Sequence, residues 1–147
     1  MKLNKRIIGI GLVAVAVVGL AACARGGRGG SAADSKVRAA IITDSAGVDD
    51  KSFNQSAWEG LQAWGKANKL EKDSGYTYFQ SNSESDFATN LSSAVDQNYN
   101  LIFGVSFRLH DAISESAKDN EKINYVIIDD VVKGQKNVES VLFADNE

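Results

Sequence analysis

The stretch LIFGVSFRLHDAISESAKDNEKINYVIID, residues 101–129, decides the fold. It begins with the continuous apolar run LIFGV (101–105) and ends with a second one, YVIID (125–129), as expected of strands that are covered on both faces. The segment between them carries four apolar residues at helical spacing, namely Leu109, Ala112, Ile113 and Ala117. The order strand, helix, strand predicts a βαβ unit with two parallel strands.

The same alternation extends to both sides of this unit. Three further runs predict strands: VRAAIIT (37–43), YTYFQ (76–80) and VESVLF (138–143). Two further stripes predict helices: Ala57, Trp58, Leu61 and Trp64, and then Phe87, Leu91 and Val95. Strands that alternate with helices predict an α/β fold, a doubly wound parallel sheet with helices on both faces and right-handed crossovers.

The first 23 residues predict a secretory signal. Lys2, Lys5 and Arg6 precede the apolar segment IIGIGLVAVAVVGL, and LAAC ends it at Cys23. LAAC resembles the lipobox of bacterial lipoproteins, in which the cysteine carries lipid and becomes the mature N-terminus. That resemblance implies a lipid anchor on the extracytoplasmic face of the cell membrane, where two acyl chains give stable attachment. The alternative is an ordinary signal peptide with an incidental thiol.

The composition of the remaining residues limits the domain size, the partners and the cysteine chemistry that are possible. Residues 24–35 are rich in Gly, Ser and Ala and predict a flexible tether, and residues 36–147 suffice for one domain. The formal net charge is −3, and it becomes more negative once the basic signal is removed, which argues against nucleic acid as a partner. Cys23 is the only cysteine, so neither an intrachain disulfide nor a cysteine-based metal site is possible.

Signals for catalysis are weak. His110 is the only histidine, and the sequence contains no G-x-S-x-G, P-loop, G-x-G-x-x-G or H-E-x-x-H motif. The acidic residues Asp44, Asp49, Asp50 and Asp129 lack the D-x-D-x-D-G spacing of a calcium loop. We therefore expect a protein that is not an enzyme and that holds neither a cofactor nor a metal.

The fold class predicts where a ligand would bind. In open parallel sheets, ligands lie beyond the carboxyl ends of the strands and near the N-termini of helices. The residues just after the predicted strands are Asp44, QSNS (80–83), Ser106 with Phe107, and Asp129 with Asp130.

The loop after the first strand is the most informative of these. Gly47 permits a tight turn, and Ser52 with Gln55 fits an S-x-x-Q capping box, so the helix is expected to begin at Phe53. Asp49 and Asp50 are expected to cap the helix and to interact with its dipole. Phe53 then lies either at the mouth of the cleft or in the core of the first turn, and periodicity does not separate the two.

An open ring at Phe53 beside Asn54 and Asp44 suits a planar heterocycle, because a base stacked on an aromatic side chain gains about 1–3 kcal/mol. Asp129 and Asp130 should point to opposite faces of the sheet, so only one of them can reach the cleft. Asp129 is alternatively a solvated carboxylate at the end of a strand. Ser106 is expected to donate to a ligand or to cap the next helix, and Phe107 to lie in the core or at the rim.

Four segments in order, DSAGVDDKSFNQSAWEG, GVSFRLHDAI, YVIIDDVV and FADNE, resemble the basic membrane lipoprotein family, and within it the purine nucleoside receptors of ABC importers. The resemblance covers residues 36–147 and implies the N-terminal lobe of a bilobal, periplasmic-binding-protein-like (type I) receptor. It also implies a purine nucleoside as ligand, a membrane permease as partner and a monomeric protein. The implied ligand-binding residues are Asp44, Phe53, Asn54, Ser106 and Asp129.

Members of that family are roughly twice as long and continue into a second lobe. We therefore expect these residues to supply half of a cleft and to bind ligand weakly or undetectably on their own. Three other functions fit parts of the pattern: a receptor for a sugar or another small polar solute, a flavodoxin-like or receiver-like signalling domain, and a surface lipoprotein that serves as an adhesin or structural module. The secretion signal disfavours the signalling domain, because such domains work in the cytoplasm.

Overall fold

The computed structural model describes residues 37–143. The predicted signal segment (1–23) with Cys23 and the predicted tether (24–35) lie outside the described residues. Five parallel strands form one sheet in the order β2-β1-β3-β4-β5, which confirms the predicted doubly wound α/β class. The strands are β1 (Ala39–Ile42), β2 (Tyr76–Phe79), β3 (Leu101–Val105), β4 (Asn124–Ile128) and β5 (Val138–Val141).

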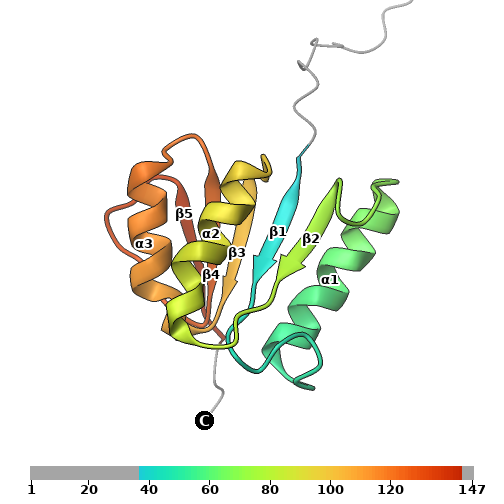
Figure 1. Cartoon of the computed structure of the whole chain (residues 1–147), viewed down its shortest axis with the longest axis horizontal. Helices are drawn as coiled ribbons and strands as arrows, with labels where there is room; N and C mark the ends of the chain where they lie inside the picture. Colours follow the sequence, from blue (N-terminus) through green and yellow to red (C-terminus); the bar gives the residue numbers. More distant parts are fainter. Residues whose placement is uncertain (1–36, 144–147) are drawn as a thin grey trace, which may run out of the picture. The chain divides into compact units, whose positions relative to one another are not determined.

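Three α-helices connect these strands (Figure 1): α1 (Phe53–Ala67), α2 (Phe87–Asp96) and α3 (His110–Asp119). Short 3₁₀ turns, Glu84–Asp86 and Phe107–Leu109, precede α2 and α3. Every predicted strand and helix is present, but the first strand begins only at Ala39 and the last ends at Val141. Leu142 and Phe143, which the sequence placed in the last strand, lie beyond it.

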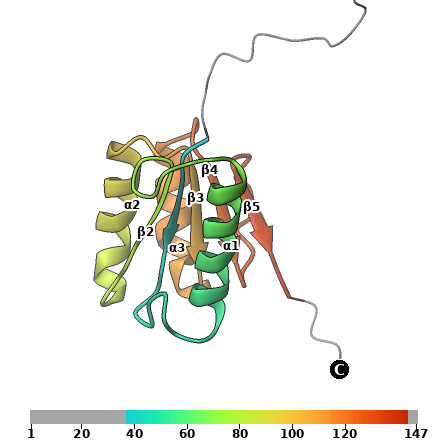
Figure 2. The same ribbon diagram turned by 90° about the vertical axis from the view of Figure 1, so that its right-hand side faces the viewer.

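One face of the sheet is closed. Figure 2 shows α2 on one side of the sheet and α1 on the other, and α3 lies beside α2. The helices α2 and α3 bury a continuous apolar cluster against β1, β3 and β4, with Leu91, Ile102 and Ile113 at most 1% exposed. Tyr99 belongs to this cluster and donates from its hydroxyl to the Asp73 carbonyl at 2.8 Å, so its polar atom is satisfied.

Within residues 37–143, α1 is the only helix on the opposite face. The connection from β4 to β5 contains no helix, so the outer strands have no helical cover of their own on this side. Trp58 and Leu61 are buried under α1, whereas Ala57 and Trp64 from the same predicted stripe are only half-buried. The helices therefore cover the two faces unequally, although the prediction of helices on both faces is confirmed.

The N-terminus of α1 corrects one prediction. The helix begins at Phe53 as expected, but the Ser52 side chain makes no capping hydrogen bond and the Gln55 amide donates to Glu59 instead. The S-x-x-Q capping box is therefore absent. Asp50 takes its place, because its Oδ1 accepts from the backbone N–H groups of Ser52 and Gln55 at 2.8 and 3.0 Å. The carboxylate satisfies first-turn donors that a hydroxyl would otherwise bind.

Candidate ligand-binding site

The carboxyl ends of β1, β3 and β4 surround an open cavity of about 330 Å³. The parallel register aligns these three strand ends at the same edge of the sheet, next to the N-terminus of α1. All five predicted ligand-binding residues line this cavity, namely Asp44, Phe53, Asn54, Ser106 and Asp129. Positions that lie up to 85 residues apart in sequence thus meet in one place (129 − 44 = 85).

Phe53 presents an open ring. Phe53 is 46% exposed, which excludes the alternative that it is a core residue. The ring stacks on Phe143, with the centroids 4.9 Å apart and the planes inclined by 21°. Phe143 does not line the cavity, so the Phe53 ring contacts Phe143 and borders the cavity at the same time. Nothing in the periodicity predicted this partner, because position 143 was assigned to a strand.

Asn54 connects two carboxylates at the base of the cavity. It is 2% exposed, and its Nδ2 donates to Asp44 Oδ1 and to Asp50 Oδ2, both at 2.9 Å. These two acceptors fix the orientation of the amide, since its oxygen cannot face them. Both side-chain donors of Asn54 are thus used within the protein. Its Oδ1 is buried and has no hydrogen-bond partner among the described residues.

The loop between β1 and α1 holds Asp44 in place. Asp44 Oδ1 also accepts from the Ala46 backbone N–H at 3.0 Å, and Gly47 has φ of +73°, which confirms the predicted tight turn. A Cβ at Gly47 would meet only the terminal amide of Gln80, at 2.8 Å, which is the flexible end of a side chain, so the positive φ is the reason that the position favours glycine. The carboxylate of Asp44 is therefore preorganised at the end of β1.

The pKa of Asp50 lies below its ordinary value of 3.8. Desolvation by partial burial raises it, but hydrogen bonds from the Gln55, Ser52 and Asn54 backbone N–H groups and from the Asn54 amide together outweigh that effect. Asp50 is accordingly a carboxylate at neutral pH. It lines the cavity as well as capping α1, a second role that the sequence did not predict.

Ser106 and Asp129 both adopt positive φ angles, +116° and +70°. Non-glycine residues rarely do so, and such strain persists where the surroundings impose it, often at functional sites. The backbone is held by hydrogen bonds from Ser106 N to the Ile128 carbonyl and from Asp129 N to the Val141 carbonyl, at 3.1 and 2.8 Å. Ser106 Oγ accepts from Arg108 N at 3.3 Å, so the predicted capping role is met while the hydroxyl proton stays available.

The neighbouring acidic residue turns to a different partner. Asp130 Oδ2 lies 2.5 Å from His110 Nδ1, and its Oδ1 accepts from Val131 N. Asp130 does not line the cavity, in line with the prediction that only one of the two aspartates can reach it. The His110 side chain is 43% exposed and pairs with Asp130.

Sequence reasoning missed two charged residues of this site, Asp50 and Arg108. Arg108 lines the cavity and pairs with Glu84 at 3.4 Å, while Phe107, 60% exposed, lies at the rim. The carboxylates of Asp44, Asp50 and Asp129 line the cavity together with this one guanidinium, which makes the site acidic and suits a ligand that is rich in N–H and O–H donors. Among residues 37–143, no three His, Cys, Asp or Glu side chains are grouped as a metal site, and no helix is long and apolar enough to cross a membrane.

Several known proteins are similar to this chain in sequence. The sequence model of the Bmp family, described as ABC transporter substrate-binding protein PnrA-like, matches residues 36–147. The ABC transporter nucleoside-binding protein BmpA of Lactococcus lactis subsp. cremoris is 55% identical over 99% of this chain and 42% of its own length. A CD4+ T-cell-stimulating antigen of Listeria innocua is 43% identical over the whole of this chain and 43% of its own. This chain therefore spans less than half of these relatives.

Solved structures agree on the fold. A solute-binding protein of an ABC transporter system from Aeropyrum pernix superposes with a TM-score of 0.63 at 20% identity, over 72% of this chain and 28% of that one. At this identity the likeness concerns the fold alone. The matching family consists of transporter substrate-binding proteins and not of enzymes, which agrees with the absence of catalytic motifs. On these grounds the chain belongs to the Bmp family of PnrA-like ABC transporter substrate-binding proteins.

Proposed function

We propose that this chain is the N-terminal lobe of a solute receptor that binds purine nucleosides for an ABC importer. Family membership supports a solute-binding role, and the relative from Lactococcus lactis is named as a nucleoside-binding protein. The observation that carries the proposal is the open ring of Phe53 beside Asp44 and Asp129 on one cavity. The ring provides a flat apolar surface for a base, and the carboxylates accept hydrogen bonds from base amines or ribose hydroxyls.

In this proposal the side chains divide into two groups. Asp44, Ser106 and Asp129 contact the ligand, because each follows the end of a strand and lines the cavity. Asn54 orients Asp44 and Asp50 through its two donated hydrogen bonds and acts as a positioning residue. The site contributes orientation and no bond-making step, so the nucleoside leaves unchanged and passes to a membrane permease.

Attachment to the membrane is part of the same proposal. Cys23 follows the apolar segment in a lipobox-like LAAC and would carry the lipid. Growth of the native host with a radiolabelled fatty acid should label the wild-type protein and leave Cys23→Ser unlabelled. Equal labelling of both proteins would remove Cys23 as the site of attachment.

The ligand class can be tested directly on this chain. We expect weak binding, so ¹H–¹⁵N correlation spectra should be recorded with millimolar adenosine, guanosine, cytidine and ribose. Purine nucleosides should shift the amide signals of Asp44, Ser106 and Asp129. Shifts with ribose alone would refute the nucleoside assignment.

A pair of variants identifies the stacking ring. Phe53→Ala should abolish the shifts caused by adenosine, since the removed ring supplies about 1–3 kcal/mol of stacking. Leu142→Ala is the matched control, because Leu142 is also an exposed apolar residue, at 59%, and does not line the cavity. Equal loss of binding in both variants would indicate a general effect and would remove the specific role of Phe53.

A further inference from the structure

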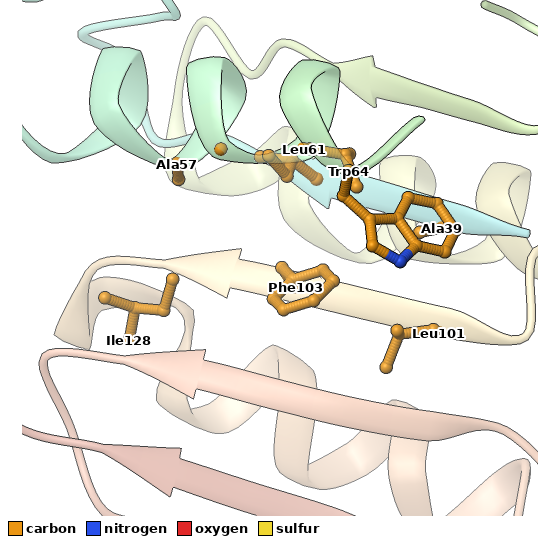
Figure 3. A pocket seen from close by; sticks show the side chains of 9 residues that line it. Ala39, Ala57, Leu61, Trp64, Leu101, Phe103 and Ile128 are labelled. Atoms are coloured by element: carbon orange, nitrogen blue, oxygen red, sulfur yellow. The ribbon is translucent and has the colours of Figure 1, made fainter. Parts of the chain in front are cut away.

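The candidate ligand site shares no residue with the apolar groove beside α1. Figure 3 shows Trp64 of that groove projecting from α1 toward Phe103 and Leu101 of β3. The side chains that keep the ligand site in shape therefore belong to its own edge of the sheet, where the turns after β1, β3 and β4 lie side by side.

The turns after β1 and β4 hold their aspartates in different ways. Asp44, after β1, accepts hydrogen bonds from the Asn54 amide and the Ala46 backbone N–H, which fix its carboxylate directly. Asp129, after β4, has φ of +70°, and within residues 37–143 its carboxylate accepts no hydrogen bond. A strained backbone with an unbonded side chain keeps one direction only where neighbouring groups impose it. The groups that direct Asp129 are therefore those of the residues beside it.

The next residue, Asp130, is fixed by two hydrogen bonds. Its Oδ2 lies 2.5 Å from Nδ1 of His110, and its Oδ1 accepts from the Val131 backbone N–H at 2.7 Å. The Asp130 side chain is only 25% exposed, so water screens its pair with His110 less than it would screen a fully exposed pair. Both carboxylate oxygens of Asp130 are engaged outside the cavity, which leaves the cavity to Asp129.

His110 connects this carboxylate to the turn after β3. It is the first residue of α3 and follows the 3₁₀ turn that begins after Ser106, whose φ is +116°. Ser106 N also donates to the carbonyl of Ile128, the last residue of β4, at 3.1 Å. One side-chain pair and one backbone hydrogen bond thus join the two strained turns that carry Ser106 and Asp129.

We propose that His110 and Asp130 form a positioning pair for Asp129. By anchoring Asp130 to the start of α3, His110 holds the backbone of Asp129 at positive φ and keeps its carboxylate toward the cavity. Neither His110 nor Asp130 lines the cavity, so the pair acts on a ligand only through Asp129. This role rests on the proposed function, because it matters for binding only if Asp129 contacts the ligand.

The pair requires a proton on Nδ1 of His110. A carboxylate only accepts hydrogen bonds, so Nδ1 has to be the donor. Long-range ¹H–¹⁵N spectra of the imidazole distinguish a protonated Nδ1 from an unprotonated one. We expect a protonated Nδ1 even at about pH 9, where a histidine side chain is normally neutral. An unprotonated Nδ1 would overturn the proposal, and this measurement needs no variant.

Hydrogen exchange of this chain without ligand tests the positioning itself. In His110→Ala, the amides of Asp129 and Ser106 should exchange at least roughly 10-fold faster than in the wild type, because a charge-assisted hydrogen bond no longer holds the two turns together. The amide of Ile102, which lies in the core, should exchange at an unchanged rate. His110→Asn should restore slow exchange, since its side-chain amide offers an N–H donor near the place of Nδ1.

Asp111→Ala is the matched control, because Asp111 is the exposed next residue in the first turn of α3. It should leave exchange at Asp129 and Ser106 slow. Equal acceleration by Asp111→Ala would mean general loosening of α3, and acceleration at Ile102 would mean loosening of the whole chain; either would overturn the proposal. So would unchanged exchange at Asp129 and Ser106 in His110→Ala. No nucleoside is present in these experiments, so their outcome is independent of the proposed ligand.

Discussion

Leu101 and Ile102 are neighbours in β3, yet they enter different environments. Ile102 points to the face under α2 and α3 and is fully buried, whereas Leu101 lines the open groove beside α1 and is half-buried. Both residues belong to one apolar run, and the sequence does not distinguish them. The difference shows that a continuous apolar run predicts a buried strand without stating how deeply each of its two faces is covered.

The largest effect should come from the closed face. We expect Ile102→Ala to lower the free energy of unfolding by about 2–5 kcal/mol, because it leaves a cavity among side chains that cannot collapse into it. Urea unfolding followed by circular dichroism measures the change. A loss below about 1 kcal/mol would mean that this face is loosely packed and that the contrast with the open face does not hold.

The next effect concerns the cap that holds α1 on the open face. Asp50→Ala should lower the free energy of unfolding by about 1–2 kcal/mol, because several first-turn N–H groups lose their acceptor. Asp49→Ala is the control, since Asp49 is the exposed neighbour. Equal costs for both variants would contradict the capping role of Asp50.

The same cap predicts a pH dependence. A lowered pKa in the folded state means that the contribution of Asp50 is fully present above its unfolded pKa and is lost as the pH falls through the folded-state value. The stability difference between the wild type and Asp50→Asn should therefore shrink as the pH is lowered below 3.8. A difference that grows on acidification would have the wrong sign and would exclude this linkage.

Leu101→Ala sharpens the comparison from the open side. We expect this substitution to lower the free energy of unfolding by only about 1 kcal/mol. The Leu101 side chain is half-buried, and its removal widens a groove without creating an enclosed void. If Leu101→Ala lowers the free energy of unfolding as much as Ile102→Ala does, the two faces do not differ in packing.

The smallest effect has the opposite sign. Gly60→Ala should stabilise this chain by up to about 1 kcal/mol, since alanine is the better helix former and its methyl group meets no other atom. Gly65→Ala is the contrasting control, because a Cβ at Gly65 would lie 2.4 Å from the Tyr76 ring, and it should destabilise. If both substitutions destabilise the chain, another part of the protein must pack against Gly60, contrary to the open space around it.

Much of the fold follows from local pattern. Apolar runs and stripes predicted the five strands and three α-helices of the described residues, because a strand covered on both faces is apolar along its length and a helix buries residues at a period of 3.6. The positions at the strand ends followed from the fold class, and Asp44, Ser106 and Asp129 do meet at one cavity. Assignment of the ligand to these residues stays a prediction.

Other features could not be predicted because they depend on the positions of distant segments. Arg108, a second role for Asp50 and the stacking of Phe143 on Phe53 leave no trace in periodicity. The capping box at Ser52 failed because two acceptors compete for the same N–H groups, and the geometry of the loop favoured the carboxylate of Asp50. Motif matching cannot rank such competitors.

The sequence by itself determined that strands alternate with helices and that polar residues follow the strands, since both depend on neighbours along the chain. Only the tertiary structure decided that α2 and α3 share one face while α1 stands alone on the other, and that Phe53 is open. The reason is that covering a face depends on which element folds over it. An apolar stripe states that a side chain should be buried and leaves its partner unspecified.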